Sequence, residues 1–455
     1  MRHSVWAILA LVAAAPVHAD ENRLAKAWQE LFAQERPPEA TKELEAVLAA
    51  VGNDAAKLKS LLDADKAYAP LPAGWRNQAI KVSDGQEERE VAFALRVPRD
   101  YGKSPERPWP LLLLAHGPKS SGQEIGLAME KRLGEETEKY ILLCPTLPGP
   151  QLFTGSSFQE RAFLEPLAWA RVHMNVDDDR ICLAGYGMGG NCAWHLATMY
   201  PHLFAAAAPM AGAPWFEASP YTNLTYLENL AHLPIWAIWG EKDAAEPPAL
   251  GTVDYCRAAR TRLLELKNDK FVGTEIPGAG QSDCWPKGDD LVKFLGSAKR
   301  EICPRNVVHV FHLAHHRRGY YLEATELSHP PIDFTQKMRL RIQTSGDPKQ
   351  ADWDRAVSEY MQKFLFRLWG ELNGGDNALT VRAASVKTIR VYVAEGMSDL
   401  SKPVTVRFWS KSWSGRVPAS AQCMLQHYAA TRDATSPIYN EIDLEFNGKV
   451  TVRYK

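Results

Sequence analysis

Residues 177–190 read D-D-D-R-I-C-L-A-G-Y-G-M-G-G, and N-C-A-W follows at 191–194. The apolar run at 180–184 predicts a buried strand, and the glycines between 185 and 190 predict a tight turn. The apolar spacing of residues 191–200 predicts a helix after the turn. We therefore expect a strand–turn–helix unit whose turn is centred on Gly187.

Strands and helices alternate on both sides of this unit. Further strands are predicted at 90–97, 109–115, 140–144, 204–209, 233–239 and 271–276, and further helices at 161–174 and 254–266. The run at 109–115 is apolar throughout, as expected for a strand that is buried on both faces. The alternation predicts a mostly parallel sheet with helices on both faces, in which ligands bind at the carboxyl ends of the strands.

The two ends of the chain differ from its middle. Residues 20–75 have helix-forming composition, which predicts a short helical segment ahead of an α/β domain at 76–300. From 301 to 455, strand-like runs follow one another, which predicts a separate β-rich domain. The stretch near 352–373 breaks that pattern because its apolar residues recur at helical spacing, and we expect a helical insertion there.

The first 19 residues have the composition of a signal peptide. A basic start precedes an apolar run too short to span a bilayer, and small residues fit a cleavage site after Ala19. We therefore expect a secreted or periplasmic protein. The seven cysteines show no disulfide spacing, although Cys284 and Cys303 flank the end of the same domain and could pair.

Charge is balanced along the chain. Its 455 residues include 53 Lys and Arg against 54 Asp and Glu, for a net charge of −1. Because no basic patch stands out, we expect no nucleic-acid partner. No segment after the signal peptide is apolar enough to cross a membrane. The expected ligand is a small molecule or a peptide, and neither its identity nor an oligomeric state is assigned.

The turn at 185–190 has the layout of a nucleophile elbow, G-x-S-x-G, in which a serine lies between a strand and a helix. With Y-P at 200–201 and L-F-A-A at 203–206, this stretch resembles secreted bacterial α/β-hydrolases of the esterase, carboxylesterase/phospholipase-like and peptidase-like groups. The resemblance implies an α/β-hydrolase fold. It extends into the β-rich domain through D-L-S-K-P-V-T-V at 399–406. In these relatives the middle residue of the elbow is serine, whereas this chain has Gly187.

The resemblance also assigns the other two triad positions, in the chain order nucleophile, acid, histidine. The stretch L-P-I-W-A-I-W-G-E-K-D at 233–243 puts the acid at Asp243. The stretch I-P-G-A-G-Q at 276–281 puts Gln281 where the relatives have histidine. Two of the three triad members are therefore replaced in this chain.

The oxyanion side of the implied pocket is altered as well. His116 and Gly117 match the His-Gly loop of the relatives, in which the next residue often lends a backbone N–H to the oxyanion hole. That residue is Pro118, which has no N–H to donate. The implied pocket lies above Gly187 and Met188, and this loop forms one of its walls.

These replacements predict that the triad mechanism is lost. Glycine has no hydroxyl to form an acyl-enzyme, and the amide of glutamine cannot take up and return a proton near neutral pH. The leading hypothesis is an exported binding or structural protein. One alternative is an active hydrolase with a rearranged site that uses Ser120, Ser121 or Ser282. Another is a surface- or carbohydrate-binding protein that acts through the C-terminal β domain.

No cofactor and no metal is predicted. His309, His312, His315 and His316 lie close together in the sequence, but their spacing in a strand-rich region does not converge two imidazoles on one ion.

Overall fold

The computed structural model describes residues 17–32, 41–64, 68, 71–104, 106–149, 153–214, 224–243, 252–331, 346–347 and 349–454. The predicted signal peptide lies outside these residues, except for 17–19, which belong to a helix. Within the described ranges, no helix combines the length and the apolar character needed to cross a bilayer.

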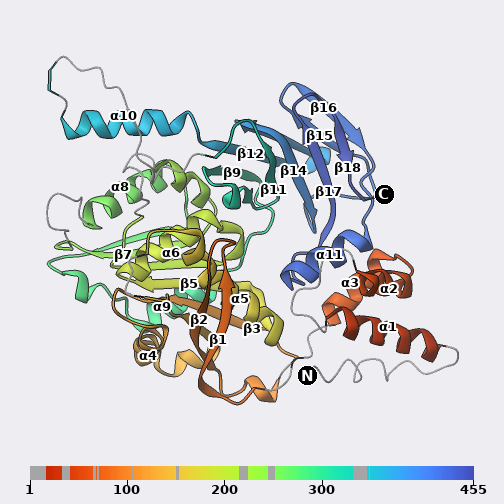
Figure 1. Ribbon diagram of the computed structural model, residues 1–455. Helices are drawn as coiled ribbons and strands as arrows, with labels where there is room; N and C mark the ends of the chain where they lie inside the picture. Colours follow the sequence, from red (N-terminus) through yellow and green to blue (C-terminus); the bar gives the residue numbers. More distant parts are fainter. Residues whose placement is uncertain are drawn as a thin grey trace.

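An eight-stranded sheet forms the centre of the first large domain (Figure 1). Its strands are β1 (Gly74–Ser83), β2 (Glu88–Val97), β3 (Trp109–Ala115), β4 (Ile141–Pro145), β5 (Val176–Tyr186), β6 (Ala206–Met210), β7 (Ile235–Gly240) and β8 (Phe271–Ile276). They are arranged in the order β1-β2-β4-β3-β5-β6-β7-β8. Strands β3 to β8 are parallel to one another. Strand β2 pairs antiparallel with β4, and β1 pairs antiparallel with β2 at the edge of the sheet. The predicted mostly parallel sheet is confirmed.

Helices cover both faces of this sheet because its central strands are apolar on both sides. In β3, Leu111 and Leu113 belong to one buried core, and Leu112 and Leu114 belong to the other. The first core packs against α5 (Ser157–His173), α6 (Met188–Met199) and α8 (Thr252–Glu265); the second packs against α4 (Gly122–Leu133) and α9 (Gly288–Ser297). The unbroken apolar run at 109–115 is thus explained by burial on both faces.

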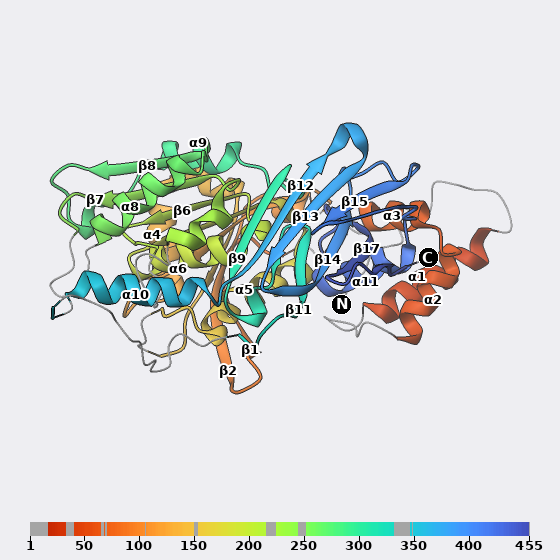
Figure 2. The same cartoon turned by 90° about the horizontal axis from the view of Figure 1, so that it is seen from above.

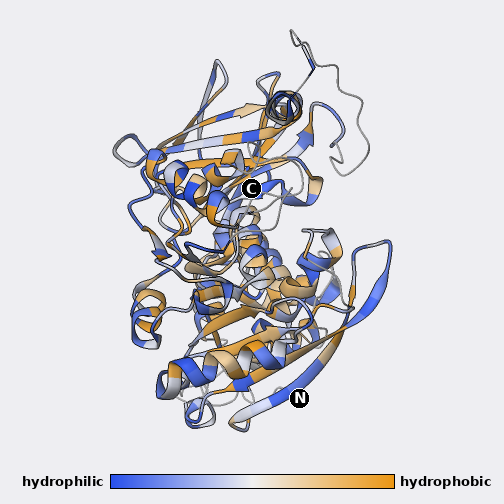
Figure 3. Cartoon of the chain, turned by 90° about the vertical axis from the view of Figure 1, so that its left-hand side faces the viewer, coloured by the Kyte–Doolittle hydropathy of each residue, from blue (hydrophilic) through white to orange (hydrophobic). Residues whose placement is uncertain are grey.

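The C-terminal domain is a pair of five-stranded sheets that enclose a core of their own. One sheet has the order β10-β11-β14-β17-β18, and the other has the order β16-β15-β13-β12-β9. The strands are β9 (Asn306–Phe311), β10 (Arg318–Gly319), β11 (Leu322–Leu327), β12 (Phe366–Asn373), β13 (Ala378–Ala384), β14 (Val386–Ala394), β15 (Val404–Phe408), β16 (Lys411–Gly415), β17 (Ile438–Glu445) and β18 (Val450–Val452). Figure 3 shows apolar residues gathered along the strands of the molecule and polar residues on its outer loops.

The helical insertion expected near 352–373 is shorter than predicted. Helix α10 covers Gln350–Gln362, and Phe366–Asn373 forms strand β12. This strand pairs with β9 on one side and β13 on the other, so both of its edges are hydrogen-bonded. Phe366, Leu368 and Gly370 are buried while Arg367 and Trp369 are partly exposed, which is the two-residue period of a strand. The helical reading failed because Phe364, Leu368 and Leu372 also recur every four residues.

The helices at the N-terminus pack on the far end of the chain. Helices α1 (Val17–Leu31), α2 (Lys42–Val51) and α3 (Ala55–Ala64) share a buried core with α11 (Ala421–Thr431). Trp28 stacks on Tyr428 with ring centroids 6.1 Å apart. Figure 2 shows this bundle beside α11 at one end of the molecule, away from the eight-stranded sheet. Cys284 and Cys303 are both free thiols, so they do not form the disulfide considered for them.

Candidate functional site

Gly187 occupies the sharp turn between β5 and α6, with φ 58° and ψ −121°. Its N–H donates to Met210 O at 2.9 Å, and its carbonyl accepts from the N–H of Gly190 at 2.8 Å. The turn is therefore tied to the neighbouring strand β6 and to the first turn of α6. A residue with a side chain is strained by about 1–3 kcal/mol in such a backbone conformation, whereas glycine adopts it freely. Position 187 thus has the backbone of a nucleophile elbow without the side chain.

The flanking glycines are needed because strand and helix approach each other closely. A Cβ on Gly185 would lie 2.0 Å from Gly189 O, and a Cβ on Gly189 would lie 1.9 Å from Ala115 O. A Cβ on Gly187 would instead find Gln281 Nε2 as its nearest neighbour, at 3.5 Å, which is ordinary van der Waals contact. The space at position 187 is therefore open to a side chain, and that side chain would face Gln281.

Gln281 follows β8 and begins the short 3₁₀ helix η7 (Gln281–Asp283). Its backbone carbonyl accepts a hydrogen bond from the hydroxyl of Tyr186, the residue before the elbow glycine. Tyr186 in turn stacks on Trp285, with ring centroids 4.1 Å apart. These contacts hold the loop after β8 beside the elbow, so the structure brings positions 187 and 281 together.

Asp243 lies directly after β7 and is only 8% exposed. Its Oδ2 atom is buried and has no hydrogen-bond partner within the described part of the chain. Burial raises the pKa of this carboxyl. The pKa of the nearby Cys284 thiol is raised to about 11, by burial first and by the charge of Asp243 next. In a working triad such an acid accepts a hydrogen bond from imidazole, and here its oxygen is left without one.

His116 is a structural residue in the loop after β3. Its Nε2 accepts from the N–H of Leu147 at 3.0 Å, and its Nδ1–H donates to Gly117 O at 2.7 Å. Burial lowers the pKa of His116, so both contacts fit a neutral ring. Pro118 follows and has no N–H to offer to an oxyanion. Met188 begins α6, and the first N–H groups of a helix have no carbonyl partner within it.

The serines considered for a rearranged site have other bonds. Ser121 is the N-cap of α4: its Oγ accepts from Glu124 N at 3.3 Å, and its own N–H donates to the Glu124 carboxylate. The Ser120 hydroxyl donates to the same carboxylate at 2.7 Å. Both hydroxyls therefore bond to the start of α4. Ser282 is an exposed residue of η7.

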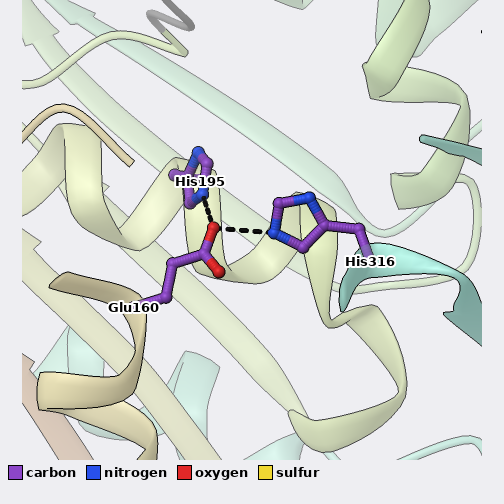
Figure 4. Close-up of side chains that lie close together, drawn as sticks. All are labelled: Glu160, His195 and His316. Carbon is purple, nitrogen blue, oxygen red and sulfur yellow. Dashed lines mark hydrogen bonds and ion pairs between the residues drawn. The ribbon is translucent and has the colours of Figure 1, made fainter. Parts of the chain in front are cut away.

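A second polar cluster, which sequence reasoning missed, lies between the two large domains (Figure 4). Glu160 Oε1 accepts from His195 Nε2 at 2.5 Å and from His316 Nε2 at 2.7 Å. Its Oε2 lies 3.1 Å from His315 Nε2 and accepts from the Tyr200 hydroxyl at 2.8 Å. Although burial raises it, the pKa of Glu160 is held well below its usual value by these histidines. The side chains of Glu160, His195 and His316 could hold a metal ion.

The sequence contains a signal for one member of this cluster, Glu160. Glu160 falls on the apolar stripe of α5 with Phe163 and Leu167, and a charged residue on such a stripe needs a buried partner. The helix predicted at 161–174 begins one residue too late to include Glu160. His315 and His316 are close in sequence, but their shared partner Glu160 comes from the other large domain.

Comparison with known proteins agrees with this architecture. The dienelactone hydrolase family matches residues 156–252, about a fifth of the chain, which include the elbow and Asp243. The strand order of the eight-stranded sheet and the sharp turn at Gly187 are also those expected of an α/β-hydrolase fold. The domain has the α/β-hydrolase fold.

Solved structures of several esterases are similar to about half of this chain. A thermostable esterase is 22% identical, with a TM-score of 0.39, and the match covers 49% of this chain and 63% of the esterase. A poly(3-hydroxybutyrate) depolymerase from Bordetella parapertussis is 18% identical over 49% of this chain and 94% of its own, with a TM-score of 0.38. An acetyl xylan esterase from Aspergillus awamori is 14% identical, with a TM-score of 0.38, and the match covers 49% of this chain and 99% of the esterase. No curated protein matches the sequence.

Proposed function

We propose that this chain is an exported α/β-hydrolase homologue that binds a ligand at the former catalytic site and does not hydrolyse it. The observation that carries the proposal is the pairing of positions 187 and 281. The elbow has the right backbone but no hydroxyl, and an amide nitrogen, not an imidazole, lies 3.5 Å from where its Cβ would be.

The chemistry of acyl transfer explains why this pairing matters. Without a hydroxyl no covalent acyl-enzyme can form at position 187, and the amide of Gln281 cannot act as a base. Loss of a triad nucleophile or histidine costs on the order of a million-fold in a serine protease, and the losses do not multiply because the groups act as a unit. Asp243 retains the acid position but has no imidazole to orient.

The groups that remain favour a ligand that carries hydrogen-bond acceptors. The Gln281 amide offers N–H donors at the elbow, and the start of α6 presents N–H groups and the positive end of a helix dipole. A carbonyl or carboxylate of a small molecule or peptide has the complementary chemistry. Secretion or location in the periplasm, expected from residues 1–19, is part of this proposal.

The test is covalent labelling of the full-length protein with a fluorophosphonate, together with an assay on short-chain aryl esters. A fluorophosphonate reacts with an activated serine, so the expected result is no adduct and no turnover above that of the buffer. An adduct on any serine with turnover that follows it would overturn the proposal and favour a rearranged hydrolase. Heat-denatured protein controls for hydrolysis by unspecific surface groups.

A further inference from the structure

We propose that Glu160, His195 and His316, with His315 as the fourth ligand, form a binding site for a zinc-class divalent ion that joins the two large domains. The four side chains come from α5, from α6 and from the 3₁₀ helix η8 (Ala314–His316) that follows β9 of the C-terminal domain. An ion here would therefore be held by both domains at once.

The ligand atoms of Glu160, His195 and His316 all lie within 4.8 Å of one another, and His315 approaches the same carboxylate from its other oxygen. The two oxygens of Glu160 face three imidazole Nε2 atoms, at 2.5 Å for His195, 2.7 Å for His316 and 3.1 Å for His315. One carboxylate and three imidazoles are all ligands that Zn²⁺ accepts, and four protein ligands form the closed tetrahedral site typical of structural zinc. The Tyr200 hydroxyl, 2.8 Å from Glu160 Oε2, would fix the orientation of the carboxylate.

Burial separates this cluster from an ordinary surface group of polar residues. The side chains of Glu160 and His316 are 1% and 0% exposed, and that of His195 is 8% exposed. A buried carboxylate is costly unless it is paired with a positive charge.

The charge around the cluster also suits a cation. Among the described residues, no lysine or arginine forms an ion pair with Glu160. A second group with suitable atoms, Cys423, His427 and Glu441, provides the contrast. There the guanidinium groups of Arg390 and Arg453 lie 3.2 Å and 2.9 Å from Glu441, so the carboxylate is already neutralised and a cation would be repelled. Of these two clusters, only the one around Glu160 is proposed as a metal site.

Metal binding requires a small adjustment of the side chains. In a tetrahedral site with bonds of about 2.0–2.1 Å, neighbouring ligand atoms lie about 3.3 Å apart. The present N···O separations of 2.5 and 2.7 Å would widen by less than about 1 Å on this geometry. His315 can follow because its side chain is 37% exposed.

The experiment uses the full-length protein, stripped with EDTA, dialysed and then supplied with ZnCl₂. We expect one equivalent of zinc by mass spectrometry and an X-ray absorption spectrum with nitrogen and oxygen neighbours only, at about 2.0–2.1 Å. Zinc should raise the thermal unfolding midpoint of the stripped protein, and EDTA should reverse the shift. A protein that retains no zinc, or a spectrum with sulfur neighbours, overturns the proposal.

Two variants and a control locate the ion. Glu160→Gln keeps the shape of the side chain and should abolish zinc retention. His315→Ala changes a half-exposed residue, is expected to fold, and should weaken zinc binding at least tenfold. His427→Gln, in the arginine-neutralised cluster, should bind zinc as the wild type does. Unchanged binding in His315→Ala, or loss of binding in His427→Gln, would place the ion elsewhere. Should Glu160→Gln fail to fold, His315→Ala and the absorption spectrum still decide the matter.

Discussion

Position 187 separates two properties that a nucleophile elbow normally combines, the strained turn and the reactive hydroxyl. The turn is retained with φ 58°, and glycine relieves the strain that a serine would have there. Pro118, in the loop after β3, has no N–H that could stabilise an oxyanion. The proposed loss of the serine and the histidine can be tested directly by putting both residues back.

Restoring both missing groups should create an esterase. In Gly187→Ser with Gln281→His, the new Oγ and imidazole would face each other, because the Cβ position at 187 already lies 3.5 Å from the side chain at 281. We expect turnover of short-chain aryl esters by the double variant and none by either single variant, since nucleophile and base act as a unit. The rate should be limited by the missing oxyanion donor, which costs about a hundred- to thousand-fold. A folded double variant without activity, or one whose activity survives addition of Asp243→Asn, would contradict the assigned positions.

Asp243 should make the protein less stable as the pH rises. Its pKa is raised by burial, so between the pKa of the unfolded chain, about 4, and the folded value the native state binds more protons than the unfolded state. The free energy of unfolding therefore falls over that interval and stays lower above it. Asp243→Asn should unfold at a higher urea concentration than the wild type at pH 7, and the two should converge near pH 3. A variant that is less stable than the wild type at pH 7 would show that the carboxylate has a partner in solution.

At the scale of single elements, the sequence predicts the central sheet well because the apolar pattern of its strands matches the burial of those strands in the structure. The prediction of a strand at 109–115 coincides with β3, whose residues are all buried. Prediction failed at Phe366–Asn373, where residues fitted both a helical and a strand period and long-range pairing with β9 and β13 decided the outcome. The Glu160 cluster could not be predicted from the sequence either, because its members meet only through long-range contacts between the two large domains.

The strand assignment of β12 can be tested by comparing one residue of this strand with one residue of helix α10. Leu368 is fully buried in the core of the C-terminal domain, whereas Trp353 on α10 is 41% exposed. Leu368→Ala should lower the free energy of unfolding by about 2–5 kcal/mol, because it leaves a cavity in a packed core. Trp353→Ala should change it by less than about 0.5 kcal/mol. Urea unfolding followed by circular dichroism measures both, and equal losses would contradict the structure.

At the scale of the whole molecule, the two large domains are joined by buried polar contacts as well as by the Glu160 cluster. The Asn229 side chain donates to Val310 O at 2.9 Å and accepts from Val310 N at 2.6 Å, so a residue of the α/β domain completes the hydrogen bonding of β9. Arg300, between the domains, bonds Asp433 at 2.7 Å and Asp179 at 3.4 Å. Contacts that satisfy backbone and charge across an interface favour a fixed arrangement, in which the C-terminal domain is a permanent part of the hydrolase-like scaffold.

Arg300 should therefore contribute strongly to stability, and in a pH-dependent way. Burial opposes ionisation of Asp433, but the charge and hydrogen bonds of Arg300 hold its pKa well below the usual value. Arg300→Met leaves that carboxylate buried without its partner, which should cost about 3–5 kcal/mol at pH 7. Because the folded pKa is the lower one, the contribution is fully present above about pH 4 and is lost as the pH falls from there toward the folded pKa. The difference between wild type and variant in urea unfolding should shrink accordingly.

Lys270→Met is the control: it removes a neighbouring exposed pair with Glu301 and should cost less than about 1 kcal/mol at any pH. An Arg300→Met protein as stable as this control would mean that the two domains do not depend on the buried pair for their docking.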